Sequence, residues 1–196
     1  MRKSIVFIGV IFVFALGSCC LSQSNTRSNI ISKISTATPK TVVDYFLLVP
    51  SKYIGYTLAE RKEMLRPGDN ARPTIIDVKH DYILIPGGDS QGTLNFVVFR
   101  HAREVVVAVL DGGYDPATPT LNFLRYERGH WRDVSKEVLP ERAWEDLPRD
   151  NSDELDNHIT FRLPRYGTKI EVFDSGGAKE YDLVWRQGKF VLREPA

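Results

Sequence analysis

Between residues 74 and 192 the sequence is a succession of short segments with the alternation and residue types of β-strands, joined by brief connections. Strand side chains point alternately to the two faces of a sheet, so an apolar residue at every second position marks a strand with one buried face. No long helical pattern lies between these segments, and a crossover between parallel strands needs one. The chain is therefore restricted to an antiparallel arrangement.

The predicted strands are 74–79, 82–85, 93–100, 104–111, 121–127, 130–134, 158–163, 168–173, 180–185 and 189–192. The segment EVVVAVLD at 104–111 is apolar on both faces, which predicts a central strand. His80 and Asp81 are expected to form a two-residue turn. Gly129 and Gly188 are expected to supply the positive φ that their turns require.

Two short helices are predicted before the strands. Thr41 with Asp44 has the spacing of a capping box, in which a hydroxyl and a carboxylate three residues apart bind each other's backbone N–H. Thr57 with Glu60 repeats this spacing before the second helix. The expected fold class is α+β, mainly antiparallel β, as a meander of hairpins with two short N-terminal helices.

One globular domain is expected over residues 41–196, which is long enough to enclose a core of its own. The core is predicted to draw on apolar residues of neighbouring strands, namely Leu94, Phe96, Val98, Val107, Phe123 and Trp131. Both cysteines of the chain, Cys19 and Cys20, precede this domain, so it must be stable without disulfides.

The first 40 residues have a different character. Arg2 and Lys3 precede the apolar run IVFIGVIFVFAL at 5–16, which is the layout of a secretory signal peptide. The run is shorter than the roughly 20 apolar residues of a membrane-spanning helix. Residues 21–40 are rich in Ser, Thr and Asn and contain no acidic or aromatic residue, which is typical of a flexible tether.

The segment Leu16-Gly17-Ser18-Cys19 resembles the lipobox of bacterial lipoproteins, in which leucine and two small residues precede the cysteine that is lipidated and becomes the N-terminus. The resemblance implies a signal peptide at 1–18 and a lipidated Cys19 that begins a tether at 19–40. It places the protein in the cell envelope, at the outer membrane if the cell is Gram-negative, with the membrane as a partner. Cleavage after Ser22 without lipidation is the alternative, and it gives a secreted or periplasmic protein.

Charge argues against a nucleic-acid partner. The first 40 residues hold five basic side chains and no acidic one, so the rest of the chain has 21 basic and 25 acidic residues and a net charge of −4. A nucleic-acid-binding domain is expected to have a basic stripe, and none is visible in the sequence. We expect no cofactor either.

The stretch PGGDSQGT at 86–93 contains G-x-S-x-G, the spacing of the nucleophile elbow of α/β-hydrolases, centred on Ser90. That elbow needs a helix directly after the serine, but 93–100 has the alternation of a strand. The same residues resemble the G-D-S-G-G motif of chymotrypsin-like proteases, from which Gln91 departs. We predict a turn between two strands, with catalysis by Ser90 as the alternative.

The four histidines, which are His80, His101, His130 and His158, show no metal-ligand spacing, and each lies at a predicted strand end or turn. The acidic segment 141–157 could offer calcium four carboxylates, those of Asp150, Asp153, Glu154 and Asp156. Their spacing does not match an EF-hand loop, so a solvated acidic loop is predicted instead. The connection 111–119 is long for a hairpin, as loops that bind ligands often are.

Taken together, these features predict an exported, lipid-anchored envelope protein with a non-catalytic binding or structural role. Its further partner is expected to be an envelope protein or a glycan. Two alternatives are a secreted serine hydrolase that uses Ser90 and a calcium-dependent adhesion or carbohydrate-binding module.

Overall fold

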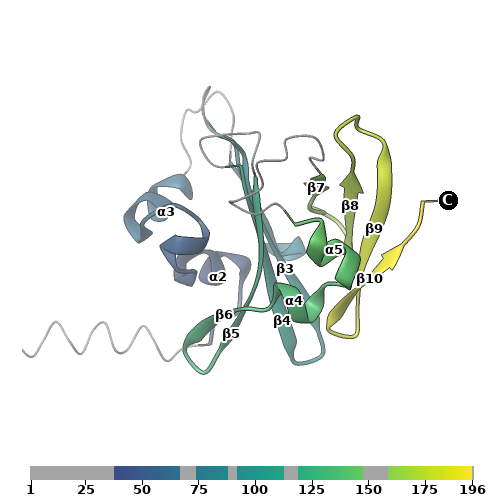
Figure 1. The fold of residues 1–196 in the computed structure, drawn as a ribbon. Coiled ribbons are helices and arrows are strands. Elements are labelled where there is room, and N and C mark those ends of the chain that lie inside the picture. The colour runs from purple at the N-terminus through teal and green to yellow at the C-terminus, as the bar shows by residue number, and fades with distance from the viewer. Residues whose placement is uncertain (1–37, 67–73, 88–91, 113–118, 148–158, 196) are drawn as a thin grey trace, which may run out of the picture. The chain divides into compact units, whose positions relative to one another are not determined.

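The computed structural model describes residues 38–66, 74–87, 92–112, 119–147 and 159–195, all within the compact unit Thr38–Ala196. Its strands form one sheet of six and one of four, and both are antiparallel meanders (Figure 1). The first sheet follows chain order, with strands β1 (Ile75–Asp77), β2 (Tyr82–Ile85), β3 (Leu94–His101), β4 (Glu104–Asp111), β5 (Thr120–Glu127) and β6 (His130–Asp133). The second sheet has the order β10-β9-β8-β7, formed by β7 (Thr160–Arg162), β8 (Lys169–Phe173), β9 (Lys179–Arg186) and β10 (Lys189–Arg193).

This architecture confirms the predicted fold class of mainly antiparallel β with short helices. Strand β4 lies inside the six-stranded sheet, between β3 and β5, as its apolar sequence predicted. The division of the meander into two sheets was not predicted, because the alternation within each strand says nothing about where the pairing of neighbours stops.

The hairpin turns follow the backbone preferences of their residues. Gly129 and Gly188 have φ of 86° and 79°, as expected, and the residues before them, Arg128 and Gln187, are also left-handed. Two successive positive φ values define the type I′ turn, whose twist matches that of paired strands. The two-residue turn predicted at His80 is wrong, because a 3₁₀ turn at Val78–His80 (η2) lengthens this connection.

The two predicted helices are present as α2 (Val42–Leu48) and α3 (Leu58–Met64), and both capping boxes are formed. The Thr41 amide donates to Asp44 Oδ2 at 2.9 Å, and this bond helps to hold the pKa of the Asp44 carboxyl below its usual value. Two further short helices, α4 (Ser135–Val138) and α5 (Glu141–Glu145), follow β6. The loop predicted over 141–157 is therefore wrong at its start.

The six-stranded sheet is covered on both faces, so the described residues form two hydrophobic cores (Figure 1). On one face, α2 and Ile54 pack on the sheet to form the helix-side core, which comprises Val42, Tyr45, Phe46, Val49, Ile54, Ile83, Ile85, Leu94, Phe96, Val98, Val107, Val109 and Leu124. On the other face, the second sheet together with α4 and α5 forms the sheet-side core.

The predicted core residues are divided between these two cores. Leu94, Phe96, Val98 and Val107 lie in the helix-side core, while Phe123 is buried on the opposite face of the same sheet. Trp131 is only partly buried, against Tyr45 and Tyr126. The prediction of one shared core is wrong. Successive side chains of a strand point to opposite faces of the sheet, and here both faces are covered, so the apolar residues are divided between two cores.

Aromatic rings join the two sheets. Phe190 of β10 lies with its ring centroid 5.0 Å from those of both Phe99 and Phe123 in the first sheet, and 5.0 Å from Trp185 in β9. Such tilted and edge-to-face pairs stabilise a core by about 0.5–1.5 kcal/mol each beyond the area they bury. This cluster fixes the tip of the β9–β10 hairpin against the β3–β4 hairpin.

None of the helices in the described part of the chain has the length and apolar character that crossing a bilayer requires.

Candidate functional site

The strand order places the predicted site residues at two opposite ends of the six-stranded sheet. Turns 78–81, 102–103 and 128–129 lie at one end, here called the hairpin end. The connections that leave β2 and β4 lie at the other end, here called the loop end. Strand β3 has eight residues, and at about 3.4 Å per residue the two ends are some 25 Å apart.

Ser90 lies outside the described residues, but its flanks lie at the loop end. The chain after Gly92 enters β3 directly as a strand, as the sequence predicted. Gly92 meets Gly112 there, and a Cβ on Gly92 would lie 2.4 Å from the Gly112 backbone. Only glycine permits this approach, so the two glycine-rich connections of the sequence meet at one point.

The histidines that the structure describes do not lie at the loop end, where Gly92 meets Gly112. His80, His101 and His130 all lie at the hairpin end, and His158 lies outside the described residues. The calcium candidates Asp150, Asp153, Glu154 and Asp156 also lie outside the described residues. In the part of the chain that the structure describes, no group of three or more His, Cys, Asp or Glu side chains is arranged to hold a metal ion.

The His80 ring is oriented by a carboxylate. Its Nδ1 lies 2.9 Å from Asp77 Oδ1, while Arg165 Nε donates to the other oxygen of Asp77 at 3.0 Å. Burial acts to raise the pKa of the Asp77 carboxyl, but the hydrogen bonds from His80 and Arg165 outweigh it and lower that pKa. Asp77 also accepts from the His80 amide and binds Arg165, which lies in the connection between β7 and β8. The Asp77 carboxylate is therefore a structural link.

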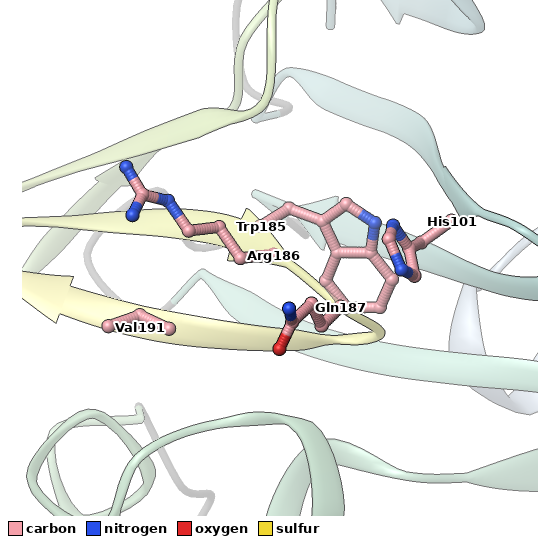
Figure 2. Close-up of a pocket in the computed structure, with 5 residues that line it drawn as sticks. All are labelled: His101, Trp185, Arg186, Gln187 and Val191. Carbon is pink, nitrogen blue, oxygen red and sulfur yellow. The ribbon is translucent and has the colours of Figure 1, made fainter.

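Two hollows lie at the hairpin end. The first, here called the Trp185 groove, has a volume of about 480 Å³ and is lined by His101, Trp185, Arg186, Gln187 and Val191 (Figure 2). Figure 2 shows the indole nitrogen of Trp185 beside the His101 ring, while Arg186 extends away along its strand. The groove thus lies between the tips of two hairpins that are distant in the sequence.

Trp185 gives this groove an unusual polar feature. The residue is 5 % exposed, and its Nε1 is buried without a hydrogen-bond partner among the described residues. A buried donor without an acceptor costs about 1–3 kcal/mol, so such groups are usually satisfied by water or a ligand. Because this nitrogen has almost no accessible surface, a ligand in the groove can reach it only if neighbouring side chains move.

The second hollow, here called the charged hollow, shares Gln187 with the first and also has a volume of about 480 Å³. It is lined by Glu104, Arg125, Lys136, Glu137, Val138, Gln187, Gly188 and Lys189. A Cβ on Gly188 would lie 1.8 Å from Glu104 Oε2. Glycine at this position therefore leaves space for the Glu104 carboxylate, and it also adopts the positive φ of the turn. The two hollows together present both donors and acceptors to a polar ligand.

A third hollow, of about 390 Å³, adjoins α5 and the start of β9. The Tyr181 hydroxyl donates to Asp146 Oδ2 at 2.5 Å, and the Arg142 guanidinium lies 4.8 Å from the centre of the Tyr181 ring. Burial raises the pKa of the Tyr181 hydroxyl, and the hydrogen bond to Asp146 raises it further. This contact joins α5 to the second sheet.

Tyr181→Phe is expected to lower the free energy of unfolding at pH 7 by about 1–2 kcal/mol, because the ring is kept and one hydrogen bond is lost. Since the folded pKa lies above the ordinary tyrosine value of about 10, the contribution of the hydroxyl is complete below pH 10 and is lost as pH rises further. Urea unfolding at pH 7 and pH 11 should therefore show a smaller difference between variant and wild type at pH 11. Tyr166→Phe, at a 62 % exposed ring, is the control.

Sequence reasoning did not find the hollows at the hairpin end. His101 and Gln187 lie in separate hairpins, and only the aromatic contacts between the sheets bring them together. The one signal within the sequence was the similarity of the turns Arg128-Gly129 and Gln187-Gly188, which indicated turn geometry but no shared surface.

Comparison with family models, curated proteins and solved structures gave no match to this chain.

Proposed function

We propose that this chain is an exported, lipid-anchored protein of the cell envelope whose domain acts by binding and not by catalysis. The observation that carries the proposal is the order of features at the N-terminus. Two basic residues, an apolar run and the segment Leu16-Gly17-Ser18-Cys19 follow one another within the first 19 residues, and a Ser/Thr/Asn-rich segment separates them from the domain. Acyl chains on Cys19 would hold the protein at the membrane, with about 0.8 kcal/mol for each buried CH₂ group.

The binding role is supported by the hairpin end. The Trp185 groove and the charged hollow adjoin one another at Gln187. Their lining includes positively charged donors from Arg and Lys side chains and negatively charged acceptors from Glu side chains. A polar partner such as an envelope protein or a glycan fits this chemistry better than an apolar ligand does. The proposed partner is of that kind.

Substitution of the two adjacent cysteines tests the anchor. Cys19→Ser is expected to abolish incorporation of labelled palmitate in bacterial cells, while Cys20→Ser leaves it unchanged, because only Cys19 follows the lipobox pattern. Intact mass should show wild-type protein that begins at Cys19 and has acyl chains. A mature chain that begins at Gln23 without lipid would contradict the proposal.

Two further measurements distinguish the alternative functions. Covalent labelling of Ser90 by a fluorophosphonate probe would support a hydrolase and contradict a non-catalytic role. A rise of the melting temperature with calcium would support an adhesion or carbohydrate-binding module that uses the acidic segment 141–157. The proposed function predicts neither result.

A further inference from the structure

We propose that the hairpin end of the domain lies against anionic lipid headgroups of the membrane that holds the anchor. The proposal rests on the proposed envelope location and names lipid headgroups as the polar partner of the hairpin end, in place of an envelope protein or a glycan. The attraction itself depends on the charge of the domain and not on acylation. Three observations carry it: unpaired basic residues lie at this end, most of the acidic residues beside them already form ion pairs, and the tether joins the domain there.

The turns of the hairpin end hold exposed basic side chains that form no ion pair with any described residue. They are Lys79, Arg103, Arg128, Lys136, Arg186 and Lys189. They come from the β1–β2, β3–β4, β5–β6 and β9–β10 turns and from α4, which follows β6. Side chains from five separate connections are thus gathered at one end of the fold.

Most carboxylates at this end are already paired. Asp81 accepts two hydrogen bonds from Arg100, at 2.6 and 2.9 Å. Glu127 and Glu137 both contact Arg132. Asp77 binds His80 and Arg165, while Glu104 faces the Gly188 turn and lines the charged hollow. The hairpin end therefore has an excess of positive charge, although residues 41–196 have a net charge of −4.

Two basic residues of the second sheet outside the turns of the hairpin end, Lys169 and Lys179, are arranged differently. Lys179 lies 3.2 Å from Glu171 and 2.7 Å from Asp182, and Lys169 contacts the same two carboxylates. Charges on this surface neutralise one another in an alternating ladder. These two lysines are therefore neutralised by carboxylates, unlike the six basic residues of the hairpin end.

The tether joins the domain at the same end. Arg100, at the end of β3, donates through Nη2 to the backbone oxygen of Lys40 at 2.9 Å while it binds Asp81. The chain that leads back to Cys19 therefore enters beside the basic turns. A lipid on Cys19 would therefore tether the domain from its hairpin end, while the loop end lies about 25 Å away along β3.

Anionic headgroups attract Lys and Arg side chains over about one Debye length, which is about 8 Å at physiological ionic strength. The contact is therefore expected to weaken with salt. It uses phosphate groups as ligands and requires no apolar insertion.

The test uses the full chain, produced and processed in bacteria and then reconstituted into vesicles of phosphatidylcholine alone or with one quarter phosphatidylglycerol. A fluorophore on His130→Cys, in a Cys20→Ser background, transfers energy to acceptor-labelled headgroups. We expect at least twofold more transfer on the anionic vesicles at 50 mM salt, and no difference between the two vesicles at 500 mM salt.

Two matched sets of substitutions remove the same number of charges. Arg103→Gln, Lys136→Gln, Arg186→Gln and Lys189→Gln together should abolish the difference between vesicles, whereas Lys52→Gln, Lys62→Gln, Arg162→Gln and Arg193→Gln together should preserve it. Melting curves establish that both variants are folded. Equal loss in both sets, or equal transfer on the two vesicles for wild type, overturns the proposal. If the chain fails to float with neutral vesicles, the anchor proposal fails, while binding to anionic vesicles still decides this one.

Discussion

Phe96→Ala is expected to lower the free energy of unfolding by about 3–5 kcal/mol, the usual cost of truncating a buried phenylalanine. Phe96 is completely buried in the helix-side core, and its ring lies edge-to-face against Phe46 of α2, with centroids 5.4 Å apart. Removing the ring leaves a cavity between β3 and α2 that neither rigid element can fill. Because a domain of this size is stable by only about 5–15 kcal/mol, the melting temperature should fall steeply.

Urea unfolding followed by circular dichroism measures this effect. Val191→Ala is the control, because Val191 is 49 % exposed on β10 and surface substitutions usually change stability by less than about 0.5 kcal/mol. Similar midpoints for Phe96→Ala and Val191→Ala would contradict the position of Phe96 at the centre of the helix-side core.

Arg61→Met is the second substitution with a large expected effect, and we expect it to cost about 3 kcal/mol or more. Arg61 is only 4 % exposed, and its Nη1 donates to the backbone oxygens of Phe46 and Val49 at 2.6 and 2.5 Å. These carbonyls belong to the last turn of α2, where helices leave acceptors without intrahelical partners. Burial lowers the pKa of the Arg61 guanidinium, but hydrogen bonding to carbonyls, and not to a carboxylate, stabilises it there.

Methionine can fill the space of the Arg61 stem, so the loss in this variant reports mainly on the two carbonyls. Arg61→Lys is expected to recover only part of the stability, since an ammonium group cannot reproduce the planar arrangement of the guanidinium donors. The neighbouring substitution Lys62→Met, at an exposed position of the same helix, should have little effect. Retention of wild-type stability by Arg61→Met in urea unfolding would mean that water replaces the guanidinium.

The burial of Phe96 could be predicted from the sequence, whereas the burial of Arg61 could not. Phe96 lies at an alternating apolar position of a strand and was predicted to be in the core. Arg61 lies in the segment LAERKEM, where it looks like an ordinary polar residue of an exposed helix. Its burial depends on the way α3 contacts α2, and no pattern within either helix contains that information.

The local structure of the chain could be read from its sequence. Alternation located the strands, because side chains of a strand point to opposite faces whatever lies beyond them. The capping boxes of Thr41 and Thr57 and the left-handed turns at Gly129 and Gly188 could also be read, since each depends on atoms within four residues. The targeting features at the N-terminus likewise belong to one short segment, and they remain predictions that the cysteine variants test.

Tertiary structure alone decided how these elements combine. It divided the meander into two sheets, covered both faces of the first sheet and placed Phe96 and Phe123 in different cores. It also brought His101 to Gln187 and gathered the basic turns at the end where Lys40 enters. These arrangements depend on contacts between segments tens of residues apart. The chain could bury the same apolar surface in several arrangements, and the one of lowest free energy forms. A local sequence pattern does not contain the energies of these alternative arrangements.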